Sequence, residues 1–242
     1  MIILFTDFGA GGPYVGQMKA VLAQYAPTVP VIDLLNEAPR FDITASAHLL
    51  AAYVSSFPAD SVFLGVVDPT VGSVERKPII VKVDGYYFVG PGNGLFDVVV
   101  AQGNDVQCWE ITWRPELLSH SFHGRDLFAP VAARLARGEL PLGEMMPSYT
   151  PRIATDDLYN IIYIDYYGNA ITGVRAAKLK ESTKLLIGET VLTHARTFSD
   201  VEIGQSFWYE NANGLVEIAV NQGHAAKLLV LKVGDAFTIE SE

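Results

Sequence analysis

The chain of 242 residues contains a single cysteine, Cys108, and no apolar run that approaches the roughly 18 residues of a membrane-spanning helix. One cysteine excludes an intrachain disulfide and offers no spacing for a zinc site, so a reducing cytoplasm is the expected location. The segment from Met1 to Phe5 lacks the basic region of a signal peptide. It is expected to form a first β-strand.

Basic residues are also scarce, since 17 Lys and Arg stand against 27 Asp and Glu, which gives a net charge of −10. Nucleic-acid backbones and anionic membrane surfaces both attract positive charge, so neither is expected as a partner. A cationic small molecule would suit this balance. The glycine-rich stretch from Gly9 to Gly12 lacks the P-loop lysine and the dinucleotide fingerprint, so neither nucleotide-binding motif is predicted.

Strand and helix patterns alternate through the first part of the chain. They predict an N-terminal α/β domain of residues 1–145 with a mainly parallel central sheet and covering helices. Within it, Ile79 to Val83 and Tyr86 to Val89 are expected to form a hairpin around Asp84-Gly85. The expected helices run from Tyr14 to about Tyr25, from Ile43 to about Phe57 and from about Leu127 to Arg137.

After this domain the pattern changes. Pro147 and Pro151 interrupt a stretch with little periodicity, so residues 146–156 are expected to be a linker. Residues 157–242 show short strand patterns separated by Asn and Gly turns, which predicts a small C-terminal all-β domain of the barrel type. Its expected strands are Leu158–Ile164, Ala170–Val174, Leu185–Ile187, Phe207–Glu210, Leu215–Val220 and Leu228–Val233.

Charged residues stand where the predicted strands end. The apolar run from Val62 to Val67 ends in Asp68, Asp7 follows the first strand, and His123 precedes a helix. Open α/β sheets bind ligands at the carboxyl ends of their strands, so these side chains are expected to line one pocket, with Arg76 turned back towards Asp68. Each of them could instead cap a local turn. A metal site is not favoured, because no local ligand spacing supports one.

Aromatic residues are plentiful around the same loops, and the sequence places Phe8, Phe41, Phe122, Tyr166 and Tyr167 there. Ordinary packing accounts for most of them. If one site uses several, a flat heterocycle such as adenine is the natural ligand.

Six separated motifs resemble a single family, in order, over nearly the whole chain. They are FTDFG with PYVGQMK, VVDPTVGS with Arg76 downstream, GPGNG, FHGRDLFAPVAA, IDYYGNAIT and NGLVEIAVNQGHAA. The family is the S-adenosyl-L-methionine hydrolases, or hydroxide adenosyltransferases, which are related to the fluorinase and chlorinase enzymes. Six motifs in the right order are far more specific than any one of them.

The resemblance implies that water or hydroxide attacks the ribose 5′ carbon of S-adenosyl-L-methionine, releasing adenosine and L-methionine without a metal or redox cofactor. It implies a homotrimer whose active sites combine the N-domain of one subunit with the C-domain of another. The hydrolytic triad would be Asp68, Arg76 and His123. The fluorinase has a tyrosine at the position of Asp68, so hydrolysis is favoured over halogenation.

The resemblance also implies substrate contacts. Asp7 would hold the ribose hydroxyls, and Phe41 and Phe8 would pack on the ligand. Asp165 would meet the methionine ammonium, and Asn169 would bind adenine. Asn211 and Asn213 belong to a loop expected near the methionine end. The chain departs from the family at Gly12 and Gly92, where aspartate is usual, and at Thr70, where glycine is usual. The departures at Gly12 and Thr70 keep open a non-catalytic protein that binds adenosine or S-adenosyl-L-methionine.

Overall fold

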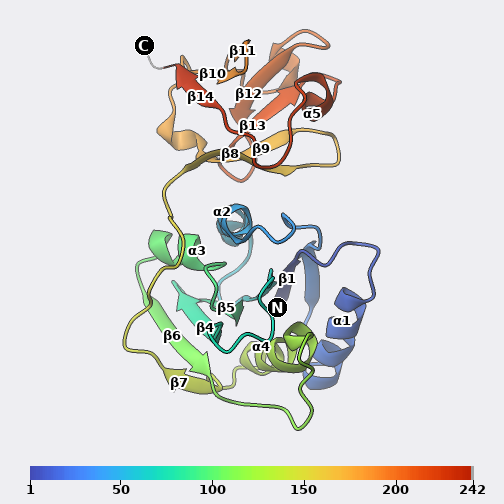
Figure 1. Ribbon diagram of the computed structural model, residues 1–242, viewed down its shortest axis with the longest axis vertical. Helices are drawn as coiled ribbons and strands as arrows, with labels where there is room; N and C mark the ends of the chain where they lie inside the picture. Colours follow the sequence, from blue (N-terminus) through green and yellow to red (C-terminus); the bar gives the residue numbers. More distant parts are fainter. Residues whose placement is uncertain (241–242) are drawn as a thin grey trace. The chain divides into compact units, whose positions relative to one another are not determined.

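The computed structural model describes residues 1–240 and divides the chain into two compact units. The first unit is Met1–Thr155 and the second begins at Asp156 (Figure 1). No helix among the described residues is long and apolar enough to cross a membrane.

The first unit is built on a seven-stranded sheet in the order β2-β1-β3-β5-β4-β6-β7. Its strands are β1 (Ile2–Thr6), β2 (Val31–Leu35), β3 (Val62–Val66), β4 (Pro78–Val83), β5 (Tyr86–Pro91), β6 (Val106–Ile111) and β7 (Gly143–Met145). All residues of β1 and β3 are buried, as expected for central parallel strands covered on both faces.

The sheet is mixed. Strands β2, β1, β3 and β5 pair in parallel, whereas β5 with β4, β4 with β6 and β6 with β7 pair antiparallel. The prediction of a mainly parallel sheet is therefore right only for its first four strands. The cause is the β4–β5 hairpin, because β4 runs against β5 and β6, on the other side of β4, then pairs with it antiparallel.

Helices cover both faces of this sheet (Figure 1). Helix α1 (Tyr14–Tyr25) packs beside α4 (Ala129–Ala136) on one face, and α2 (Ile43–Tyr53) packs beside α3 (Asp97–Gln102) on the other. Asp42 starts α2 by accepting a hydrogen bond from the Ala45 amide at 2.9 Å, which satisfies one of the free N–H groups of the first turn.

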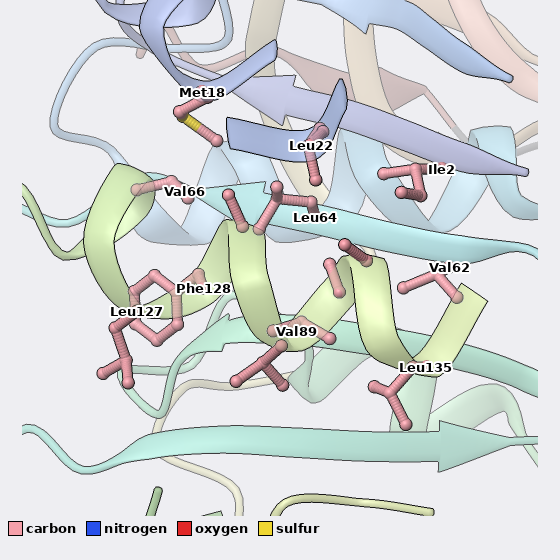
Figure 2. Packing of buried hydrophobic residues seen from close by; sticks show 14 of the residues in the cluster. Ile2, Met18, Leu22, Val62, Leu64, Val66, Val89, Leu127, Phe128 and Leu135 are labelled. Carbon is pink, nitrogen blue, oxygen red and sulfur yellow. The ribbon is translucent and has the colours of Figure 1, made fainter. Parts of the chain in front are cut away.

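The core under α1 and α4 is mostly aliphatic, with Phe128 and Trp109 as its buried aromatic residues. Figure 2 shows Leu64 and Val66 of β3 facing Phe128, with Met18 and Leu22 of α1 beside them. Each such side chain stabilises the fold by about 1.5–3 kcal/mol when fully buried. This packing fixes α4 against β1, β3 and β5, so the residues at the start of the helix are held over the ends of those strands.

Two buried side chains, in β6 and α3, are a thiol and a carboxylate. Cys108 of β6 is 3% exposed, and burial raises the pKa of its thiol to about 11. Asp97 of α3 is fully buried and accepts hydrogen bonds from the Tyr149 hydroxyl at 2.5 Å and from the amides of Arg152 and Ile153. These bonds tie residues 149–153 to the first unit, so this part of the expected linker is anchored.

The second unit consists of two antiparallel sheets. One has the order β12-β13-β9-β8 and the other β11-β10-β14. The strands are β8 (Leu158–Ile164), β9 (Ala170–Arg175), β10 (Lys184–Ile187), β11 (Thr190–Leu192), β12 (Ser206–Glu210), β13 (Leu215–Val220) and β14 (Thr238–Glu240). An all-β second unit is thus correct apart from the short α5 (Ala225–Leu228). Its two sheets are joined at both edges by isolated bridges, between Asn160 and Ala236 and between His194 and Trp208, as the expected barrel requires.

One predicted strand of this unit is wrong. Residues 228–233 were expected to form a strand, but α5 ends at Leu228 and the chain then turns, with the Leu231 amide donating to the Ala226 carbonyl at 2.9 Å. Leu231 is buried while Leu228 and Val230 are exposed. A run of apolar residues at a helix end gives the same local pattern as a strand, and periodicity alone does not separate the two.

Candidate active site

The candidate site lies at the carboxyl ends of the parallel strands β1 and β3. Thr6 and Val66, the last residues of these strands, are paired in register, so Asp7 and Asp68 follow at the same edge of the sheet. Asn93 donates a hydrogen bond of 2.8 Å to the Val67 carbonyl and fixes the backbone just before Asp68. This is the edge at which α/β sheets bind ligands.

Arg76 joins Asp68 to His123. Its Nη2 atom lies 2.9 Å from Oδ2 of Asp68 and 2.7 Å from Nδ1 of His123, and the side chains of Arg76 and Asp68 are each only 4% exposed. The guanidinium also lies 5.6 Å from the ring centroid of Phe128, within the range of a cation–π contact. The structure therefore brings the three expected triad residues into contact in a largely dry environment.

The contact with Arg76 determines which nitrogen of His123 carries the proton. A guanidinium has only N–H donors, so Nδ1 of His123 must accept and the proton of the neutral ring must be on Nε2. Burial, followed by the positive charges of Arg76 and Arg114, lowers the pKa of His123. The ring thus stays neutral near pH 7 and offers an N–H donor at its other nitrogen.

Asp68 has the properties of a general base. Burial raises its pKa, and the positive charge of Arg76 opposes that rise only in part. Thr70 also lowers this pKa through its amide and hydroxyl, but among residues 1–240 neither carboxylate oxygen of Asp68 has an aligned hydrogen-bond partner. The Arg76 contact is accordingly an ion pair that leaves lone pairs of the carboxylate available to accept a proton.

Asp7 and Phe41 form a second feature at the same edge. The amide of Phe41 donates to Oδ2 of Asp7 at 3.1 Å, and this bond partly opposes the rise that burial causes in the pKa of Asp7. Phe41 has a φ of 61°, a left-handed conformation that is uncommon for a residue with a side chain, and its ring is 68% exposed. The Asp7 bond thus holds an exposed aromatic residue beside a half-buried carboxylate.

Phe8 belongs to an aromatic cluster with Tyr14 and Phe122. The ring centroids of the three residues are 5.4 to 6.0 Å apart, with the planes steeply inclined to one another. The cluster packs over Gly124, where an added Cβ would lie 3.5 Å from Phe8 and 3.6 Å from Phe122. The cluster therefore joins the loop after β1 to the helix start that carries His123. The expected contact between Phe8 and a ligand stays a prediction.

The residues at this edge do not bring a cluster of metal-ligand side chains together. Residues 1–240 contain no group of three or more His, Cys, Asp or Glu side chains that could hold a metal ion. Arg76 also stands between Asp68 and His123, so its positive charge occupies the position that a cation would need.

Two glycines where the family usually has aspartate differ in their surroundings. At Gly92 an added Cβ would lie 2.8 Å from the Lys77 carbonyl oxygen, so a side chain there requires the backbone to move. At Gly12 the nearest atoms would be the Phe8 carbonyl oxygen at 3.3 Å and the Tyr14 ring at 3.5 Å. Packing thus requires glycine at position 92. At position 12 a side chain would need only a small shift of its neighbours.

In the second unit, Asp165 and Asn169 share one turn between β8 and β9. Oδ1 of Asp165 accepts the Asn169 amide at 2.8 Å, and Oδ2 accepts the Asn169 side-chain amide at 3.2 Å. Between them, Tyr166 and Tyr167 are 97% and 74% exposed. The structure thus brings the two expected ligand residues together. Two of the hydrogen bonds that the Asp165 carboxylate can accept are already used to hold the turn.

Asn211 has a structural function that the sequence did not reveal. Its Oδ1 accepts hydrogen bonds from the amides of Asn213 and Leu215, and its Nδ2 donates to Glu217 at 2.9 Å. Glu217 is 5% exposed and also accepts the Tyr209 hydroxyl at 2.5 Å. The missed signal was the one acidic residue inside the apolar run LVEIAV of β13, which indicates a buried polar network.

Replacing Asn211 by alanine is expected to destabilise the second unit by about 1–3 kcal/mol, because two backbone amides and a buried carboxylate would lose a partner. Urea unfolding measures this loss. Asn213→Ala is the matched control, since within the described residues its side chain has no hydrogen-bond partner and its change should stay within about 0.5 kcal/mol. Equal losses in the two variants would contradict the assignment.

Comparison with known proteins defines the class to which this fold and site belong. Residues 2–145 match the SAM hydroxide adenosyltransferase N-terminal domain, and residues 159–238 match the corresponding C-terminal domain. The chain belongs to the SAM hydroxide adenosyltransferase family.

Individual relatives agree with this membership. The chain is 37% identical to the (R)-S-adenosyl-L-methionine hydrolase of Salinispora arenicola over 253 residues, which covers 97% of this chain and 95% of that protein. A solved structure of an uncharacterized conserved protein from Thermotoga maritima superimposes with a TM-score of 0.90 at 32% identity and covers all of both chains. The fluorinase of Nocardia brasiliensis is more distant, at 24% identity over 97% of this chain and 94% of that enzyme.

Proposed function

We propose that this chain hydrolyses S-adenosyl-L-methionine to adenosine and L-methionine. The observation that carries the proposal is the buried contact of Asp68, Arg76 and His123 at the ends of parallel strands, in a chain that resembles S-adenosyl-L-methionine hydrolases over almost its full length. In the relative's name, (R)-S-adenosyl-L-methionine hydrolase, the prefix L already specifies the amino-acid centre. The label (R) therefore refers to the sulfonium sulfur. The (R) epimer is therefore the proposed substrate.

The reaction exchanges one bond for another at the ribose 5′ carbon. A water oxygen forms a bond to this carbon, the carbon–sulfur bond breaks, and its electron pair stays on the sulfur of L-methionine. Sulfonium is already a good leaving group, so no acid is needed at the sulfur. The protein's contribution is to hold the water in line with the carbon–sulfur bond and to remove its proton.

Asp68 is the proposed base. Of the triad, Arg76 stays protonated, and Nδ1 of His123 is occupied by the Arg76 N–H, so the carboxylate is the group with lone pairs to receive the proton. A raised pKa brings Asp68 closer to the working pH, which makes it a stronger acceptor. Arg76 stabilises hydroxide character in the attacking water, and the Nε2–H of His123 orients it.

The substrate contacts follow the family pattern with one change. Asp7 is proposed to hold the ribose hydroxyls, Phe8 and Phe41 to contact the ligand, Asp165 to meet the ammonium group and Asn169 to bind adenine. For the loop of Asn211 and Asn213 we propose backbone contacts alone, because the Asn211 side chain already has three hydrogen bonds. Residues 1–145 would thus carry the chemistry, residues 146–156 the link, and residues 157–242 the adenine and methionine contacts.

The assembly proposed from the same resemblance is a homotrimer with sites formed between subunits, working without a metal or redox cofactor. The lone cysteine favours a reducing cytoplasm. Light scattering coupled to size-exclusion chromatography measures the oligomeric state, and a chelator added to the assay tests the absence of a metal requirement.

The activity is tested by incubating the purified chain with each sulfonium epimer and following adenosine by chromatography. Adenosine is expected from the (R) epimer at a rate well above the spontaneous background, with no dependence on chloride or fluoride. Calorimetric binding without turnover would replace this function by that of a non-catalytic binding protein. A halide-dependent 5′-halogenated adenosine would reassign the chain to halogenation.

A further inference from the structure

His123 is oriented by an unusual turn of helix. It directly precedes Gly124–Phe128, a π-turn in which the amide of Ala129 donates to the carbonyl of Gly124, and α4 continues from there. The extra residue in the turn changes the direction of the preceding side chains by about 100° relative to an uninterrupted α-helix. Such π-turns are rare, and they are found often at functional sites.

Pro130 explains why the turn is wide. It is buried, it is the second residue of α4, and it has no N–H to donate to an earlier carbonyl. In a regular α-helix its ring would collide with the carbonyl four residues earlier, which belongs to Asp126. The wider π-turn over 124–128 offers a way to avoid this collision.

Arg125 fixes the turn to its surroundings. Its Nε and Nη2 atoms donate to the two carboxylate oxygens of Asp126 at 2.6 and 3.0 Å, and its Nη1 donates to Gln17 of α1 at 3.0 Å. The guanidinium also lies 4.9 Å from the ring centroid of Phe122. Asp126 in turn accepts the Ser119 amide at 2.9 Å. Residues on both sides of His123 are thereby held to α1 and to the loop before the turn.

We propose that Pro130 and Arg125 are positioning residues for His123: Pro130 imposes the π-turn that directs Nδ1 of His123 towards Arg76, and Arg125 holds that turn in place. Neither residue needs to contact the substrate. The expected effect of these residues on kcat rests on the proposed function. Their effect on geometry does not, because it concerns the 2.7 Å contact between Arg76 and His123.

The test compares Pro130→Ala and Arg125→Met with Arg137→Met. Arg137 is the matched control because it joins the other end of α4 to α1, through the Tyr25 carbonyl at 2.9 Å, and lies far along the helix from His123. If the proposal is correct, the first two variants lose about 10- to 100-fold in kcat, as expected for a misplaced catalytic group, while KM changes by less than about threefold. The control should retain both constants.

A second measurement does not depend on activity. Nitrogen-15 NMR of the histidine rings reports whether Nδ1 of His123 is an acceptor, with assignment by a His123→Gln variant. In the wild type, the signal of a neutral ring with its proton on Nε2 is expected, and Pro130→Ala and Arg125→Met should alter it while Arg137→Met does not. An unchanged ring signal with unchanged kcat in both variants, or equal losses in the control, would overturn the proposal.

The two proposals fail in different ways. A wild-type chain that releases no adenosine but shows the expected His123 signal, altered in the two variants, would refute the hydrolase function and retain the positioning. A wild-type chain that releases adenosine normally, and keeps its kcat and ring signal after both substitutions, would refute the positioning alone.

Discussion

Replacing Asp68 by asparagine is expected to lower kcat for adenosine release by about 10²–10⁴-fold, because it removes the one triad member that can accept the proton of water. Asparagine keeps the size of the side chain but has no basic oxygen. Single-turnover measurements with S-adenosyl-L-methionine separate this loss from any change in binding. A residual kcat within about threefold of the wild type would exclude Asp68 as the base.

The same substitution has a cost in stability that must be controlled. Arg76 is buried, so the loss of its counter-charge is expected to destabilise the first unit by about 3–5 kcal/mol. The double variant Asp68→Asn with Arg76→Gln removes the uncompensated charge and should recover part of that loss in urea unfolding. Its kcat should remain as low as in Asp68→Asn, which distinguishes a chemical defect from unfolding.

Replacing Arg76 by glutamine is expected to move the acidic limb of the kcat profile to higher pH and to lower the plateau by about 10²–10³-fold. Burial raises the pKa of Asp68 and Arg76 lowers it in part, so removing the positive charge raises that pKa further. In the proposed mechanism the active form is the ionised carboxylate, so activity is expected to be lost as pH falls through this pKa. With a higher pKa, the loss begins at a higher pH.

A pH series of kcat in saturating substrate measures this shift. Arg114→Gln is the control variant. Arg114 lowers the pKa of His123 and of Arg76, but it is not among the groups that shift the pKa of Asp68. Its acidic limb should stay in place. An acidic limb that moves to lower pH in Arg76→Gln would contradict the assignment of the limb to Asp68.

Much of the site could be predicted because it depends on strand ends. An apolar run that stops at a carboxylate specifies where Asp68 lies, and parallel pairing of β1 with β3 then places Asp7 at the same edge. The contacts of Arg76 and His123 depended on the resemblance, since these residues are 47 positions apart and no local pattern joins them. Their chemical roles remain predictions.

The remaining errors have a common physical cause, which is that local patterns do not encode pairing. The β4–β5 hairpin was predicted, yet the antiparallel pairing of β6 with β4, and of β7 with β6, appears only once the strand order is known. The apolar residues after α5 gave a strand pattern because burial of Leu231 by a turn and burial by a sheet look alike in sequence. The hydrogen bonds of Asn211 are a further case, since a polar loop residue is equally typical of ligand binding and of turn formation.

Cys108 gives this chain a practical advantage for physical measurements. Its thiol is 3% exposed and has a pKa of about 11, so only a very small fraction is thiolate at neutral pH. A maleimide probe should therefore leave the native chain unlabelled and react with a cysteine introduced at Tyr166, which is 97% exposed. Paired with a second introduced cysteine on the first unit, this labelling would allow fluorescence or spin-label distances between the units to be recorded without first building a cysteine-free background.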